Sequence, residues 1–222
     1  AVLAFQADSN FEVAIGSTEG ETILSINNTR APLNDVRVRR AIAHAIDRQA
    51  IIDGAMFGFG TPIGTHFAPH HPAYVDLTGT YPHDPAKAKA LLAEAGVSDL
   101  KLTLKLPPPI YARRGGEIVA AQLKEAGIAV EIIPVEWAQW LEQVFRGDDF
   151  DLTVVSHTEP LDIGIYARDK YYFNYDSPAF KAVIKRLNAT SDPVARTALL
   201  AVAQDIITVD SVNAYMFQLA RL

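Results

Sequence analysis

The residues best suited to chemistry lie in one short segment, Ser156-His157-Thr158-Glu159. It holds the residue types of a hydrolytic triad: a hydroxyl nucleophile, an imidazole base and a carboxylate. Successive residues of an extended chain point to opposite faces, however, whereas the side chains of a triad must converge. We therefore predict that this segment recognises a ligand and does not catalyse a reaction.

Four histidines raise the alternative of a metal-dependent hydrolase. His66, His70, His71 and His83 fall within eighteen residues, and imidazole is a common zinc ligand. The prolines among them argue against a helical pair of ligands, and no glutamate stands between them as in a His-Glu-x-x-His protease helix. We expect surface histidines without a metal, and the hydrolase is kept as the alternative function.

Acidic and aromatic side chains gather near the same segment. Glu159 and Asp162, together with the acidic run 148–151, would favour a cationic group on a ligand, although solvated loop charge explains Asp148 and Asp149 equally well. The run 171–175 is dense in aromatic rings, which bury area both at the edge of a core and in a ligand platform. Both interpretations of these rings stay open.

Length and composition exclude several classes of protein. The chain has 222 residues, of which 49% are hydrophobic, enough for one large domain or two small ones. A net charge of −6 without a basic run argues against nucleic-acid binding. The absence of cysteine excludes disulfides, thiolate metal sites and cysteine catalysis. No apolar stretch is long enough for a membrane span, and residues 1–5 lack the pattern of a signal peptide.

The second half of the chain alternates between strand and helix patterns. We predict strands over 100–106, 128–133 and 150–155, separated by helices over 117–126 and 137–145. This order implies right-handed crossovers and largely parallel pairing. Ligands of such sheets lie beyond the carboxyl ends of the strands, where the loops 107–111 and 156–162 are expected.

Turn and cap residues define the remaining elements. The further expected elements are a strand over 11–15, a turn over 16–20, a strand over 22–26, a helix capped by Asn34 or Asp35 with an apolar face that runs to Ile46, a glycine-rich loop over 54–64, a helix over 84–96, helices over 178–187 and 193–209, and a last strand over 213–219. In the capped helix, Arg37, Arg40 and Arg48 are expected to face outward.

Four stretches resemble one family. Residues 27–48, with Asn27-Asn28-Thr29, Pro32 to Ile42 and Ala45-Ile46-Asp47-Arg48, resemble the most recognisable motif of the family 5 solute-binding proteins of peptide/nickel-type ABC importers. The helix 84–96, the turn 122–128 and the run from Trp137 through Gly147 to Asp151 are similar to the same family.

The resemblance implies a fold, a function and a location. It implies an α/β lobe of the type II periplasmic-binding-protein kind, with a mixed, largely parallel sheet flanked by helices. The function implied is capture of a small solute, such as a peptide, for delivery to an ABC permease in the membrane, without catalysis and without a cofactor. The full-length protein would be a monomer in the periplasm or otherwise outside the cytoplasm.

The resemblance also implies a division of the chain. Because such proteins are about twice as long, we expect a C-terminal lobe fragment, with hinge-proximal strands of the other lobe over 1–28, the ligand-binding lobe over 29–212 and a return hinge strand over 213–222.

Peptide-binding relatives carry a tryptophan after the matching strand, and then an aspartate that pairs with the ligand's amino terminus. Here His157 takes the place of the tryptophan, and Glu159 or Asp162 must supply the acid, so a peptide and another small solute are both open. The candidate ligand-binding residues are Ser156, His157, Thr158, Glu159, Asp162, Tyr171, Tyr172 and Asn174, with Tyr215 and Phe217 near the hinge.

Overall fold

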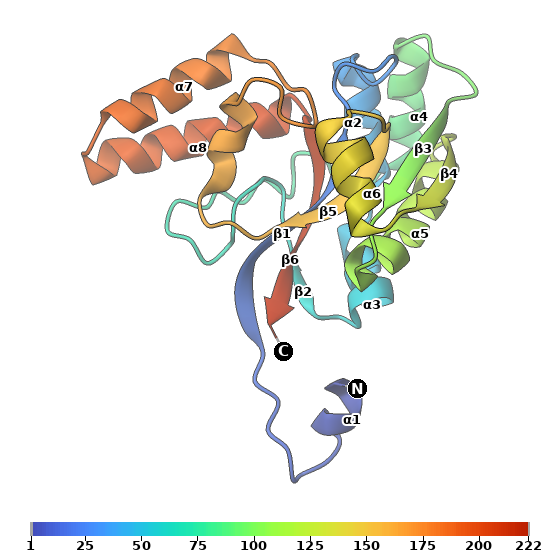
Figure 1. The fold of residues 1–222 in the computed structure, drawn as a ribbon, viewed down its shortest axis with the longest axis vertical. Coiled ribbons are helices and arrows are strands. Elements are labelled where there is room, and N and C mark those ends of the chain that lie inside the picture. Colours follow the sequence, from blue (N-terminus) through green and yellow to red (C-terminus); the bar gives the residue numbers. More distant parts are fainter. Residues whose placement is uncertain (1, 222) are drawn as a thin grey trace.

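The computed structural model describes residues 2–221, which form a six-stranded sheet in the order β2-β6-β1-β5-β3-β4, with helices on both faces (Figure 1). The strands are β1 (Gly16–Ile26), β2 (Gly60–Pro62), β3 (Lys101–Leu106), β4 (Ala129–Pro134), β5 (Leu152–His157) and β6 (Asn213–Arg221). The helices are α1 (Val2–Gln6), α2 (Val36–Ala45), α3 (Arg48–Met56), α4 (Pro85–Glu94), α5 (Ile110–Glu125), α6 (Trp137–Trp140), α7 (Pro178–Ala189) and α8 (Pro193–Val209), with the π-helical η1 (Leu141–Arg146) and the 3-10 helix η2 (Asp162–Ala167).

The mixed sheet expected from the sequence is present. Strand β3 pairs in parallel with β4 and β5, as the strand–helix alternation predicts. The parallel part ends there, because β1 runs antiparallel to both β5 and β6, and β2 runs antiparallel to β6. The carboxyl ends of β3 and β5 therefore meet at one edge of the sheet, where ligands are expected.

The strand predicted over 11–15 and the turn predicted over 16–20 are both wrong. Residues 11–15 have no regular structure, and β1 begins at Gly16 and runs through the predicted turn. The long partner strand β6 explains the difference, since it pairs with Gly16 and Ser17 and the Thr18 hydroxyl donates to the Leu219 carbonyl at 2.7 Å. Pairing with a distant strand has overridden the local turn preference.

The single helix expected after Asp35 is split in two. Asp35 caps α2 by accepting from the Arg37 N–H at 2.8 Å, but Ile46 is extended and Asp47 caps a second helix, α3, by accepting from the Ala50 N–H at 3.0 Å. The restart turns Arg48 inward, against the prediction, and its guanidinium donates to the Tyr215 carbonyl at 2.8 Å.

The start of α4 is predicted correctly, whereas the start of α5 is not. Asp84 caps α4 by accepting from the Lys87 N–H at 2.8 Å, and Gly96 follows the helix with φ +71, as expected. Helix α5 starts at Ile110 and not at 117, directly after Pro109, so Tyr111 belongs to a helix and not to a ligand loop.

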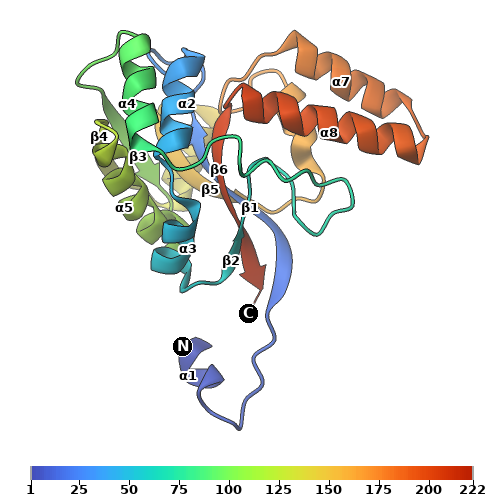
Figure 2. The same cartoon turned by 180° about the vertical axis from the view of Figure 1, so that it is seen from behind.

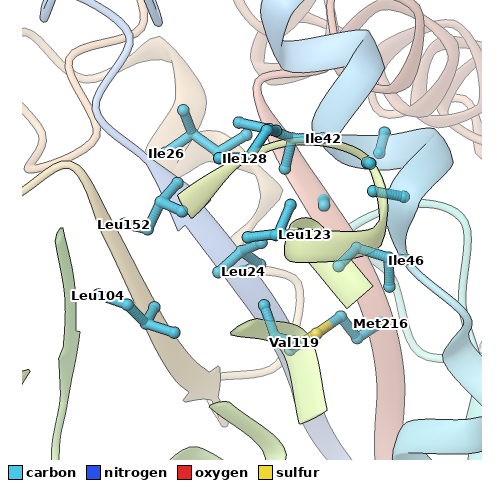
Figure 3. Packing of buried hydrophobic residues seen from close by; sticks show 14 of the residues in the cluster. Leu24, Ile26, Ile42, Ile46, Leu104, Val119, Leu123, Ile128, Leu152 and Met216 are labelled. Atoms are coloured by element: carbon cyan, nitrogen blue, oxygen red, sulfur yellow. The ribbon is translucent and has the colours of Figure 1, made fainter. Parts of the chain in front are cut away.

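The sheet separates two hydrophobic clusters. The first lies between the sheet and α2, α3, α4 and α5, and Figure 3 shows Leu24 and Ile26 of β1 packed there against helical side chains. The second lies on the opposite face, beneath α6, η1, η2, α7 and α8, and includes Ile23 of β1. Figure 2 shows α7 and α8 on this side of the sheet. Alternation along β1 thus gives each face its own core. No helix within residues 2–221 combines the length and the apolarity needed to cross a membrane.

Candidate functional site

Two histidines and an aspartate converge at the carboxyl end of β5. His157 is the last residue of β5, Asp162 opens η2, and His66 comes from the loop that follows β2. Oδ1 of Asp162 lies 2.8 Å from Nε2 of His66, and Oδ2 lies 3.3 Å from Nδ1 of His157. All three side chains are almost fully enclosed. One carboxylate therefore bridges two imidazoles below the surface.

A tyrosine hydroxyl holds the other ring nitrogen of each imidazole. The Tyr166 hydroxyl lies 3.1 Å from Nδ1 of His66 and also accepts from the Asn213 amide at 3.0 Å. The Tyr172 hydroxyl lies 3.0 Å from Nε2 of His157, and the two rings are stacked with an interplanar angle of 10°. These contacts fix both rings, so their inner nitrogens stay directed at Asp162.

A second acidic residue completes the group. Glu21 of β1 lies directly opposite His157 in the antiparallel pairing and is only 4% exposed. Its Oε2 atom is buried without a hydrogen-bond partner. Glu21, His66 and Asp162 line a cavity of about 10 Å³, room for a single water-sized occupant.

Burial controls the charges of these groups. Burial raises the pKa of the Glu21 carboxyl to about 7, because an isolated carboxylate is poorly solvated there. Burial also lowers the pKa of His157, against the pull of Asp162. For Asp162 burial acts to raise the pKa, but His66 and His157 outweigh it and hold that pKa well below its usual range. Near neutral pH the bridging carboxylate of Asp162 is thus ionised, while Glu21 changes charge.

The remaining residues of the segment are divided between the two faces of β5 and the loop beyond it. Ser156 pairs with Thr22 of β1, and its Oγ atom is buried without a partner. It therefore makes no hydrogen bond with the His157 ring, consistent with the prediction that no triad forms here. Thr158 and Glu159 are exposed beyond the end of the strand.

The aromatic run contributes unequally. Tyr172 is buried behind His157, whereas Tyr171 is half-exposed, with its ring centre 6.4 Å from that of His157. The Asn174 amide donates to Oδ1 of Asn27 at 3.3 Å. Asn174 therefore helps to fix the chain after β1.

The structure separates Tyr215 and Phe217, although they are two residues apart on one strand. Tyr215 faces the histidines, with its ring centre 6.4 Å from that of His66, whereas Phe217 belongs to the core on the opposite face. The register between β1 and β6 shifts here, since Thr22 pairs with Phe217 but Ile23 pairs with Tyr215. Met216 is thus an extra residue in β6, a β-bulge. Beyond it the side chains of β6 point to the other face, so Phe217 does not reach the site.

The four-histidine group expected for a hydrolase does not form. His70 pairs with Glu19 at 2.6 Å, and Nδ1 of His83 lies 3.1 Å from the Ala45 carbonyl. Among the described residues, only His66, His157 and Asp162 bring three potential metal-ligand atoms within 4.8 Å of one another. The hydrolase alternative is thus not supported, and His66, expected at the surface, is buried beside Asp162.

Sequence reasoning missed both His66 and Glu21 as members of the site. Each belongs to a segment far from Asp162 along the chain, and their meeting depends on the path of the loop after β2 and on the β1–β5 register. The one local signal was the acidic residue in Glu21-Thr22-Ile23, next to a β-branched strand pattern. A carboxylate in a buried strand is rare and indicates a partner or a site.

Comparisons with known proteins agree on one family. The model of the bacterial extracellular solute-binding proteins, family 5 Middle, matches residues 1–162. The dipeptide-binding protein of Escherichia coli is 34% identical over 131 residues, covering 56% of this chain and 24% of that protein. Heme-binding protein A of Haemophilus influenzae is 32% identical over 131 residues, with the same coverage of both chains.

Solved structures show the same fold. The periplasmic binding protein DppA from Helicobacter pylori, in complex with the peptide STSA, matches with a TM-score of 0.84 at 24% identity, over 100% of this chain and 46% of that chain. The present chain thus spans less than half the length of these relatives. The fold is that of the type II periplasmic binding proteins. From the family match over residues 1–162, the chain belongs to the bacterial extracellular solute-binding proteins of family 5.

Proposed function

We propose that the chain forms one lobe of an ABC importer's solute-binding protein, which captures a small solute such as a peptide and delivers it to a membrane permease. The boundaries proposed are hinge-proximal strands over 1–28, the ligand-binding lobe over 29–212 and a return strand over 213–222. The complete protein would act outside the cytoplasm as a monomer and would close two lobes around the solute without catalysing a reaction.

The observation that carries this proposal is the group of buried polar side chains at the carboxyl end of β5. Polar groups are buried only when they are paired or serve a site, and ligands of such sheets lie at this edge. His157, Asp162 and half-exposed Tyr171 form the proposed wall, with exposed Thr158 and Glu159 at its rim. Because two imidazoles already engage Asp162, Glu159 is the carboxylate best placed to meet a cationic ligand.

The size of the cavity supports a site shared between two lobes. A space of about 10 Å³ holds one water, far less than a dipeptide requires. Most of a solute's contacts would thus come from the second lobe on closure. We expect weak or undetectable solute binding by this lobe alone.

A thermal-shift screen of the complete protein tests the proposal, with peptides, sugars, opines and amines as probes. A solute at a hundredfold excess over its Kd stabilises the folded state by ~2.7 kcal/mol. A shift with one solute class in the complete protein, and none in residues 1–222 alone, is the expected result. If no solute class shifts the complete protein, solute capture is wrong.

A matched pair of variants tests the rim. Glu159→Gln removes the proposed charge, whereas Glu125→Gln alters an exposed glutamate of α5 on the other side of the sheet. For a cationic solute, Glu159→Gln is expected to weaken binding by about 2 kcal/mol, roughly thirtyfold, with Glu125→Gln unchanged. If both variants bind the solute with equal affinity, Glu159 is not part of the site.

A further inference from the structure

We infer that His66, His157 and Asp162 form a binding site for one divalent transition-metal ion such as Zn²⁺, with Glu21 beside it. Two imidazoles and one carboxylate are a donor set that zinc accepts in proteins, with the fourth position left to water. This site shares His157 and Asp162 with the proposed solute wall, and a metal ion there requires no solute.

The positions of the donor atoms fit one ion. In a tetrahedral site with metal–ligand bonds of about 2.1 Å, neighbouring donor atoms lie about 3.4 Å apart. Nδ1 of His157 is 3.3 Å from Oδ2 of Asp162, and Nε2 of His66 is 2.8 Å from Oδ1. One nitrogen of each imidazole and one oxygen of Asp162 lie within 4.8 Å of one another, so rotations of these side chains would place the three atoms around an ion.

The surroundings of the two rings match those of metal ligands. A metal-binding histidine usually has its second ring nitrogen held by a hydrogen bond, which sets the orientation of the ring. Here Tyr166 lies 3.1 Å from Nδ1 of His66, and Tyr172 lies 3.0 Å from Nε2 of His157. Each ring thus presents its remaining nitrogen to the same point beside Asp162.

Glu21 supplies the independent sign of a ligand. Its Oε2 atom is buried without any hydrogen-bond partner. Buried polar atoms in folded proteins rarely lack a partner. Glu21 lines the same small cavity as His66 and Asp162, whose volume of about 10 Å³ suits one ion or water. A water held in that cavity by an ion bound to His66 and Asp162 would give this orphaned oxygen a partner.

Metal titration of the complete protein, first stripped with a chelator, tests the site. We expect one Zn²⁺ per chain by calorimetry, and Co²⁺ as a spectroscopic probe should give the intense visible absorption of a tetrahedral site. His66→Gln and Asp162→Asn should each abolish this binding. His83→Gln, which changes an exposed histidine that lies outside the cluster, should leave it intact.

The tyrosines provide a milder test that leaves the donor atoms in place. Tyr172→Phe removes only the hydroxyl beside His157 and should weaken metal affinity by about 10–100-fold. Should the ligand variants fail to fold, X-ray absorption of the Zn²⁺-loaded wild type decides, because the site requires two imidazoles in the coordination shell. No stoichiometric ion, a shell without imidazole, or binding that survives Asp162→Asn would overturn the site.

Discussion

Oδ1 of Asp162 lies 2.8 Å from Nε2 of His66, although 96 residues separate the two in the chain. The same carboxylate reaches His157 at 3.3 Å, so it joins the loop after β2 to the end of β5. Removing its charge would leave two imidazoles without their shared partner.

Asp162→Asn is therefore expected to lower the free energy of unfolding by about 1–3 kcal/mol, measured by urea denaturation in the presence of a chelator. Asp169→Asn is the control, since Asp169 forms only an exposed ion pair with Lys181 and such pairs contribute little. Equal stability of the two variants would show that the bridge does not hold the loop.

Glu21→Gln tests the charge buried in β1. The pKa of Glu21 is raised to about 7 from 4.5, so the folded state binds the proton more tightly than the unfolded state. The protonated carboxyl therefore contributes fully to the free energy of unfolding below about pH 4.5. This contribution, up to about 3 kcal/mol, is lost as the pH rises through 7. The variant has no such proton, so its advantage over the wild type should grow between pH 5 and pH 8. Urea denaturation across this range, with a chelator present, measures it, and a pH-independent difference would contradict the assignment.

Two adjacent glycines of α5 are expected to respond oppositely to alanine. A Cβ atom at Gly116 would lie 2.4 Å from Cδ1 of buried Leu106, so Gly116→Ala should destabilise the protein by about 1–3 kcal/mol. At Gly115 the nearest atom, Cγ2 of Ile51, is 3.7 Å away. Gly115→Ala should be neutral or gain up to about 1 kcal/mol from helix propensity. Thermal denaturation of both variants measures this difference. Equal shifts of the two midpoints would refute the close approach of Gly116 to Leu106.

Asn28 joins three segments through one amide group. Its Nδ2 atom lies 2.8, 3.1 and 2.9 Å from the carbonyls of Ile26, Phe173 and Val212, so its two N–H groups are shared among three acceptors. Asn28→Ala should lower the free energy of unfolding by about 2 kcal/mol, at roughly 1 kcal/mol for each of the two N–H groups. Exposed Asn34 provides the matched control, because Asn34→Ala breaks no side-chain bond of this kind. A loss of less than 1 kcal/mol in Asn28→Ala would contradict this role.

Local patterns predicted the parallel strands and several of the helices well. The strands β3, β4 and β5 and the helices α4, α7 and α8 follow from periodicity and from caps such as Asp84, which act within a few residues. The beginning of β1 failed because its structure depends on pairing with β6, some two hundred residues away. A single sequence does not reveal which distant strand will supply those partners.

The candidate site was predicted in part for the same reason. His157 and Asp162 are close in sequence, and their meeting follows from a short loop after a strand. His66 and Glu21 are distant from them, and their membership depends on one loop path and one strand register. Phe217 was grouped with Tyr215 by simple alternation, which the register shift between β1 and β6 breaks.

The long stretch of sequence between His66 and Asp162 also has a kinetic consequence. Contacts between distant residues require the closure of a long loop, and they form after the local helices and the nearby parallel strands. The environment of His66 should therefore be among the last to become native during refolding. An imidazole signal from this one residue, followed by time-resolved NMR, would mark the end of folding and not the initial collapse.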